Sequence, residues 1–99
     1  MFARIARWEG ADAAALEESA AQIRAQAEAA GGPPPGVPAK ELLLLHDTAA
    51  GKAVAISLFE TEEDYRQGDE TLNSMSPPGG GMGTRVSVEK LELVVRAQA

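Results

Sequence analysis

Residues 41–60, ELLLLHDTAAGKAVAISLFE, contain two apolar runs separated by a short turn. Glu41–Asp47 and Lys52–Glu60 flank Thr48–Gly51, and a four-residue turn that contains glycine is typical of a β-hairpin. In the first arm both sets of alternating side chains are apolar, and in the second arm Val54, Ile56 and Leu58 alternate with Ala53, Ala55, Ser57 and Phe59. Because neighbouring residues of a strand point to opposite faces of the sheet, we expect both faces of this hairpin to be covered.

The segment before the hairpin predicts a strand followed by a helix. Phe2–Trp8 alternates loosely, which suits a strand. Ala11–Ala30 is alanine-rich, with Asp12 as the expected N-cap and Gly31 at its end. Its apolar stripe has helical spacing and consists of Ala13, Leu16, Ala20, Ile23, Ala27 and Ala30. Since four of these six residues are alanine, the helix contributes little apolar area to the core.

The segment after the hairpin predicts a second helix and a last strand. Thr61 is the expected N-cap, and the apolar stripe of the helix is Tyr65, Gly68, Leu72 and Met75. Gly68 implies a close approach to the sheet, and Pro77-Pro78 is expected to stop the helix. The strand is expected over Thr84–Arg96, with its buried side switching near residues 89–90 through a bulge or a crossing into a partner's sheet.

Two segments rich in proline or glycine are interpreted as connections. Residues 33–38, PPPGVP, favour a stiff surface connection of polyproline character, although proline-rich peptide ligands have a similar composition. Residues Gly79–Gly83 favour a linker, with a mobile lid as the alternative.

Composition indicates one domain, residues 1–99, and a homodimer. Leu, Ile, Val and Phe together number 20 of 99 residues, whereas alanine alone accounts for 19. A small domain with so few large apolar side chains gains stability by burying surface against a second subunit. The helices of such a chain can cover one face of the sheet, so the second face is also expected to meet a partner.

Charge and cysteine content exclude several classes of function. The net charge is −6, from nine Lys or Arg and fifteen Asp or Glu, and no basic cluster is present, so no nucleic-acid partner is expected. The absence of cysteine excludes disulfides, thiolate nucleophiles and cysteine-ligated metals. The sequence contains neither a signal peptide nor an apolar run long enough for a membrane span, so we expect a cytoplasmic protein without membrane contact.

The order β-α-β-β-α-β predicts an α+β, ferredoxin-like protomer. Three stretches go further: MFARIARWEG (1–10), HDTAAGKAVAISLFETEEDY (46–65) and VSVEKLELVV (86–95). They resemble the antibiotic biosynthesis monooxygenase superfamily of small dimeric α/β-barrel proteins. The resemblance implies two four-stranded sheets packed face to face as a barrel, with the helices outside. Members include cofactor-free oxygenases of polycyclic phenols, haem-degrading enzymes and proteins without known activity, so the fold alone does not choose a function.

Haem and metal ions are not expected. The haem-degrading members of that superfamily carry asparagine on the first strand and tryptophan and histidine around the second helix. This chain has Arg4 and Arg7 on the first strand and Tyr65 on the second helix. One histidine among surface acids does not supply a metal site.

Two residues are candidates for catalysis. His46, the sole histidine, ends an apolar strand and could act as a general base, although a solvent-facing strand end is the alternative. Tyr65 lies on the buried stripe of the second helix, where its ring suits the core and its hydroxyl requires a partner or a cavity.

Three further residues are candidates for binding a substrate. Trp8 could line the mouth of a pocket or pack at a subunit contact, and Asn73 could bind a ligand or cap its helix. Leu72 would supply apolar wall to a modest cavity between sheet and helices. Two functions therefore remain open. One is a cofactor-independent monooxygenase that acts on a hydrophobic or aromatic small molecule, and the other is a non-catalytic dimeric module that binds a small molecule or serves a structural role.

Overall fold

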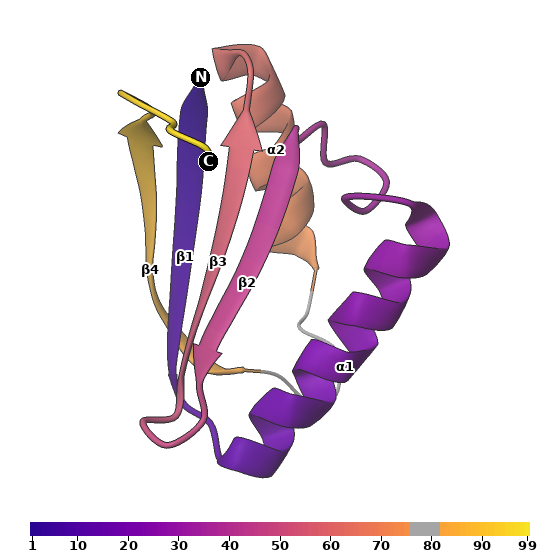
Figure 1. The fold of residues 1–99 in the computed structure, drawn as a ribbon, viewed down its shortest axis with the longest axis vertical. Coiled ribbons are helices and arrows are strands. Elements are labelled where there is room, and N and C mark those ends of the chain that lie inside the picture. The colour runs from indigo at the N-terminus through magenta and orange to yellow at the C-terminus, as the bar shows by residue number, and fades with distance from the viewer. Residues whose placement is uncertain (76–81) are drawn as a thin grey trace.

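The computed structural model describes residues 1–75 and 82–99, which follow the order β-α-β-β-α-β (Figure 1). The elements are β1 (Phe2–Gly10), α1 (Ala13–Ala30), β2 (Glu41–Asp47), β3 (Lys52–Phe59), α2 (Glu62–Ser74) and β4 (Gly83–Glu92). One antiparallel sheet has the strand order β2-β3-β1-β4, and both helices lie on the same face of it. This α+β architecture is compatible with a small ferredoxin-like fold. Neither helix of the described residues is long and apolar enough to cross a membrane.

The β2–β3 hairpin confirms the prediction, with β3 ending one residue earlier than expected. The Asp47 carboxylate accepts a hydrogen bond from the Ala50 backbone N–H at 3.1 Å, which caps the turn. Gly51 has φ +69°, and a Cβ at this position would lie 2.6 Å from the carbonyl oxygen of Ala11. The turn therefore requires glycine for both its conformation and its close approach to the start of α1.

Helix α1 begins at Ala13, directly after the predicted N-cap, and packs on the sheet through its N-terminal half. The Asp12 carboxylate accepts a hydrogen bond from the Ala15 backbone N–H at 2.7 Å, which confirms the predicted N-cap. Leu16 and Ser19 are its buried residues. The C-terminal part of the expected stripe is less covered, since Ala27 and Ala30 are exposed. Alanine side chains are too short to contact the sheet from there, so this end of the helix is not packed against it.

Helix α2 lies closer to the sheet than α1. The Thr61 hydroxyl accepts a hydrogen bond from the Asp64 backbone N–H at 3.1 Å, as predicted for the N-cap. A Cβ at Gly68 would lie 2.3 Å from Cε1 of Phe59, and the Phe59 side chain is fully buried. The predicted close approach is therefore confirmed, because the glycine leaves the space that the phenylalanine ring occupies.

Strand β4 differs from its prediction at both ends. Glu92 lies opposite Phe2, the first residue of β1, so the residues after Glu92 have no strand of this sheet to pair with. The register irregularity lies opposite the Arg7–Trp8 step and leaves Val86 unpaired. The expected switch near residues 89–90 is wrong, because the register there is regular and β4 carries apolar side chains on both faces. The predicted helix stop at residues 77–78 and most of the 79–83 run lie outside the described residues.

The connection between α1 and β2 contributes a core residue that the sequence did not predict. Val37 is buried and packs in one cluster with Phe59 and Tyr65. Its backbone N–H donates to the Pro34 carbonyl at 3.1 Å, which forms a turn. The proline-rich segment is therefore anchored to the core rather than running wholly over the surface.

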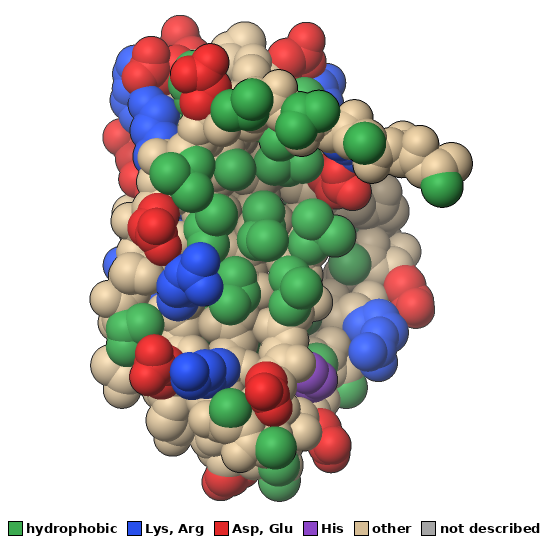
Figure 2. Space-filling view, turned by 60° about the vertical axis from the view of Figure 1, so that its left-hand side comes forward, with side chains coloured by type: hydrophobic (Ala, Val, Ile, Leu, Met, Phe, Trp, Pro, Cys, Tyr) green, Lys and Arg blue, Asp and Glu red, His purple; other side chains and the backbone are tan. Residues whose placement is uncertain are grey.

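The sheet face opposite the helices is largely apolar and is covered only in part by the described residues, since Ala3 and Leu58 are buried whereas several of its leucines are exposed (Figure 2). Leu43, Leu45 and Leu91 are 42%, 51% and 48% exposed. The strand register places on this same face Ala3, Ile5, Val54, Ile56 and Leu58. Charged side chains surround the apolar centre in Figure 2. We call this surface the open face. Its exposed apolar side chains would be removed from water only if another surface packed against it.

Candidate functional site

A cavity of about 850 Å³ lies between the helix-covered face of the sheet and the two helices. Its volume is within the range of about 300–1,000 Å³ that is common for small-molecule sites. The larger apolar side chains of its wall are Trp8, Ile23, Leu42, Leu44, Leu72, Met75 and Met82. Five polar side chains also line it, namely Arg4, Gln26, Ser57, Asn73 and Arg85. We call this space the larger cavity.

The alanine content of α1 explains why the larger cavity is open. Ala27 and Ala30 face it from the C-terminal half of the helix, and Leu42 and Leu44 face it from β2. An alanine side chain extends one carbon from the backbone and leaves the opposing leucines without contacts at close range. A space of this size therefore remains where longer side chains would form a core.

Arg4 is a buried cation at the wall of the larger cavity. Alternation along β1 places it on the helix-covered face, where it is 3% exposed. Its Nε donates to Oδ1 of Asp69 at 2.7 Å, and its Nη2 donates to Oδ1 of Asn73 at 2.9 Å. Asp69 and Asn73 are four residues apart on α2, so both side chains reach the same guanidinium. The Asp69 carboxylate compensates the charge of Arg4, as the burial of a cation requires.

Arg85 joins this group because of the irregularity in β4. The register shift places Arg85 opposite Trp8, on the helix-covered side of the sheet. Its Nη1 donates to Oδ1 of Asn73 at 2.8 Å. In a regular strand, an arginine one residue before Val86 would point to the open face, so the bulge redirects it. Two guanidinium groups thus converge on one amide oxygen at the wall of the larger cavity.

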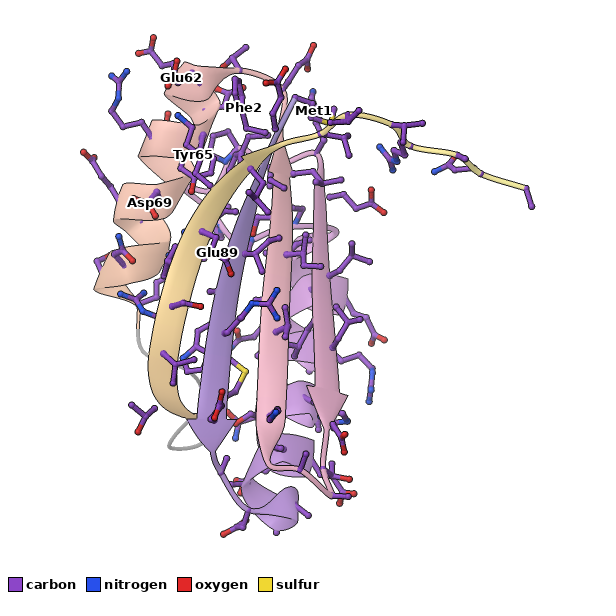
Figure 3. The ribbon with its side chains drawn as sticks, turned by 90° about the vertical axis from the view of Figure 1, so that its left-hand side faces the viewer. Met1, Phe2, Glu62, Tyr65, Asp69 and Glu89 are labelled. Carbon is purple, nitrogen blue, oxygen red and sulfur yellow. The ribbon has the colours of Figure 1, made fainter. Side chains whose placement is uncertain are left out.

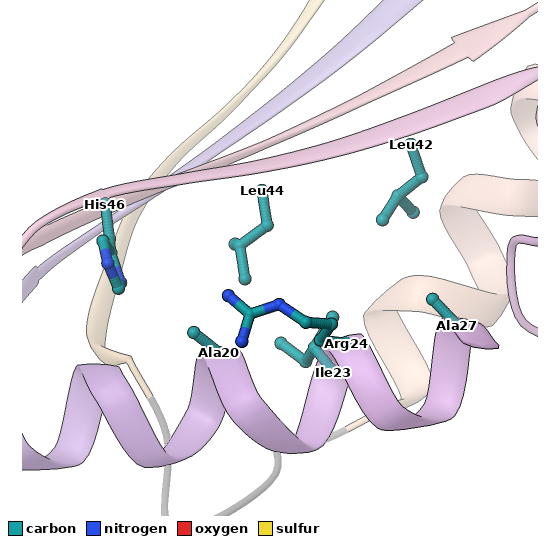
Figure 4. A pocket seen from close by; sticks show the side chains of 7 residues that line it. All are labelled: Ala20, Ile23, Arg24, Ala27, Leu42, Leu44 and His46. Carbon is teal, nitrogen blue, oxygen red and sulfur yellow. The ribbon is translucent and has the colours of Figure 1, made fainter. Parts of the chain in front are cut away.

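A smaller cavity of about 200 Å³ lies between α1 and β2 (Figure 4). His46 and Arg24 line it together with Ala20. It shares with the larger cavity the wall residues Ile23, Ala27, Leu42 and Leu44. His46 itself is exposed, at the end of β2. The sole histidine therefore borders a space that adjoins the larger cavity without lining that cavity itself.

Tyr65 lies in the core between α2 and the sheet (Figure 3). Its ring packs edge-on against Phe59, with 5.4 Å between the centroids, and Nζ of Lys90 lies 5.1 Å from its centroid. Burial raises the pKa of the Tyr65 phenol above its ordinary value of 10.0; the Asp69 carboxylate adds to this shift and Arg4 opposes it. The phenol is therefore protonated at neutral pH and cannot serve as a general base there.

The structure brings together the three predicted binding residues but not the two predicted catalytic ones. Trp8, Leu72 and Asn73 all line the larger cavity. His46 borders the smaller cavity, and Tyr65 lines neither. The roles of all five in binding or catalysis remain predictions.

The sequence reasoning missed the two arginines and Asp69 as site residues. Arg4 carried a usable signal, because an arginine at an inward position of a buried strand requires a carboxylate partner. Asp69 and Asn73 are spaced as a pair on one helix face. Arg85 carried no such signal, since the bulge that redirects it cannot be located from the alternation of β4.

Comparisons of the sequence with protein families and with curated proteins give no relative. No protein-family model matches this chain, and no curated protein matches it. Within residues 1–75 and 82–99, no three His, Asp or Glu side chains form a group that could hold a metal ion. The cavity and its arginines are therefore the features from which a function can be argued.

Proposed function

We propose that this protein binds an apolar small molecule in the larger cavity. The observation that carries the proposal is a space of about 850 Å³ with an apolar wall and a few polar groups at one part of it. Sites for small molecules commonly combine these features, because the apolar wall supplies affinity and the polar groups fix orientation. Trp8, Leu72 and Asn73 are the binding residues that the sequence predicted.

We also propose that the protein is a homodimer in which a second copy covers the open face. The support is the apolar surface around Leu43, Leu45 and Leu91, because contiguous exposed apolar side chains mark interaction surfaces. Two sheets packed in this way would form the α/β barrel implied by the resemblance to the antibiotic biosynthesis monooxygenase superfamily. Sedimentation of the wild type should give a dimer and Leu43→Glu a monomer. A monomeric wild type at micromolar concentration would contradict the proposal.

The binding proposal is tested with an uncharged fluorescent probe, N-phenyl-1-naphthylamine. Its emission should increase and saturate on titration with the protein, and the emission of Trp8, the sole tryptophan, should change in parallel. Ala27→Leu should weaken the binding because the longer side chain occupies the space. Ala21→Leu, an exposed position on the same helix outside both cavities, is the matched control. Absence of saturable binding would refute the proposal.

A cofactor-independent monooxygenase is the second candidate. The observation in its favour is the pair of guanidinium groups beside an apolar space, because cations stabilise the phenolate that must form before such a substrate reacts with dioxygen. His46 is the predicted base and Tyr65 a predicted donor.

Oxygen consumption with phenolic substrates and no added cofactor tests this second function. His46→Ala and Tyr65→Phe should each lower turnover while the dimer is unchanged. If both variants retain full turnover, the predicted catalytic pair is wrong. If no phenol supports oxygen consumption, the binding function stands alone.

A further inference from the structure

The two arginines of the larger cavity differ in how their charges are compensated. Arg4 is buried and its Nε lies 2.7 Å from the Asp69 carboxylate. Arg85 forms no ion pair with any residue that the structure describes. Residues 76–81, whose sequence is SPPGGG, contain no acidic side chain that could be its partner. The wall of the cavity therefore carries one uncompensated positive charge.

One hydrogen bond directs the guanidinium of Arg85 toward Asn73 and leaves its other donors unused within the described part of the chain. Nη1 donates to Oδ1 of Asn73, and the same oxygen accepts a hydrogen bond from Arg4. A guanidinium has five N–H donors, so most donors of Arg85 remain available. Arg85 is exposed, and its contact with Asn73, which also accepts from the buried Arg4, places the guanidinium at the wall of the cavity.

The remainder of the wall restricts the ligand to one with a single charged end. Apolar side chains from β1, α1, β2 and α2 surround the space. A second charge on the ligand would lie against apolar surface without a partner. A planar guanidinium matches a carboxylate, which it can bind through two parallel hydrogen bonds.

From this geometry we propose that the larger cavity takes an apolar monocarboxylate, with its carboxylate at Arg85 and its apolar body between α1 and β2. The Arg4–Asp69–Asn73 group is the fixed, electrically neutral support of this head-group site. The inference rests on the proposed binding function and adds to it the chemical class of the ligand.

The test compares three ligands of equal chain length as competitors of N-phenyl-1-naphthylamine: decanoate, decanol and decyltrimethylammonium. Decanoate should displace the probe at a concentration about tenfold or more below that of decanol, because a charge-assisted hydrogen bond is added. The cation should bind more weakly than decanol, because Arg85 repels it. The preference for decanoate should decrease as salt is added.

Variants test whether Arg85 causes the preference for decanoate over decanol. Arg85→Gln should bring the affinity for decanoate to that for decanol while leaving decanol unchanged, and Arg85→Lys should restore part of the difference. Arg24→Gln is the matched control, because Arg24 lines only the smaller cavity. Unchanged decanol binding by each variant shows that the cavity is intact.

The outcomes separate this inference from the function on which it rests. If neither the probe nor decanol binds, the proposed binding function is wrong. If decanol and decanoate bind equally, or if the preference survives Arg85→Gln, the assignment of a carboxylate to Arg85 is overturned while the cavity remains a binding site. If Arg24→Gln removes the preference, the head group lies in the smaller cavity and the assignment is likewise overturned.

Discussion

The two helices lie on the same face of one sheet and use that face differently. Helix α2 packs closely, because Gly68 leaves room for the ring of Phe59 and Tyr65 packs beside it. Helix α1 packs through Leu16 near its start and then leaves a cavity behind its alanines (Figure 4). Small residues thus have opposite effects in the two helices. A glycine opposite a large ring gives close packing, whereas alanines opposite leucines leave space.

The two helices also contribute different parts of the candidate site. The closely packed helix carries Asp69 and Asn73, which hold Arg4 and contact Arg85. The loosely packed helix provides the wall of the space that a ligand would occupy. A binding site of this kind requires both a closely packed helix, which positions the polar groups, and a loosely packed helix, which leaves the space unfilled.

Truncation of large side chains should show the contrast most strongly. Phe59→Ala should lower the free energy of unfolding by about 3–5 kcal/mol, because Phe59 is fully buried beneath α2. Ile23→Ala should cost only about 1 kcal/mol, because Ile23 is partly exposed and faces a cavity. Urea unfolding followed by circular dichroism at one protein concentration measures both values. Equal losses would show that α1 is packed as closely as α2.

Filling the close contact under α2 should have the next largest effect. Gly68→Ala should lower the free energy of unfolding by about 1–3 kcal/mol, since the added Cβ overlaps the Phe59 ring and this cost exceeds the better helix propensity of alanine. Gln67→Ala, at the exposed neighbouring position, is the control and should be nearly neutral. A stabilised Gly68→Ala protein would mean that the ring can move aside at no cost.

Filling the space behind α1 should have a smaller effect on stability. Ala27→Leu should change the free energy of unfolding by less than about 1 kcal/mol, because the leucine enters a cavity and meets no packed side chain. The same variant should weaken binding of the uncharged probe by about tenfold. Thermal unfolding and probe titration are measured on the same samples, with Ala21→Leu beside them. A large destabilisation would contradict the existence of free space at this position.

The smallest expected effect concerns an exposed ion pair at the start of α2. The Lys90 ammonium, 2.5 Å from Oε1 of Glu62, lowers the pKa of that carboxyl below its ordinary value of 4.5. A lowered pKa in the folded state means that the unfolded state binds more protons, so the contribution to stability is complete above pH 4.5 and is lost as the pH falls through the folded-state pKa. Lys90→Met should remove this part of the acid dependence in unfolding curves between pH 6 and pH 3. If the free energies of unfolding of wild type and variant differ by the same amount at pH 6 and pH 3, the pair does not contribute to the acid dependence.

Local patterns predicted the elements of this protein well. The caps at Asp12 and Thr61 and the turn after Asp47 rest on hydrogen bonds that span three residues, so the sequence contains all the partners. The alternation of β2 and β3 predicted both strands and the apolar character of both sheet faces. The last strand was predicted less well, because its end depends on where β1 begins and its irregularity on the pairing with β1.

The candidate site was predicted in part. Trp8, Leu72 and Asn73 line the larger cavity, as expected for residues on inward positions of their elements. Arg4 and Arg85 were not assigned to a site, and His46 and Tyr65 do not share one. The group of Arg4, Asp69, Asn73 and Arg85 comes from three elements, and contacts between distant elements leave no local pattern in the sequence.

Local sequence patterns are sufficient to predict the order of helices and strands, their caps, and the presence of a helix too poor in large side chains to complete a core. These follow from interactions between residues close together in the chain and from side-chain size. The packing of the elements decides that the missing volume collects into two adjoining cavities, and that a bulge opposite the Arg7–Trp8 step turns Arg85 toward Asn73 at the wall of the larger one. Strand register and helix distance are properties of the whole packed sheet, and they decide which side chains meet.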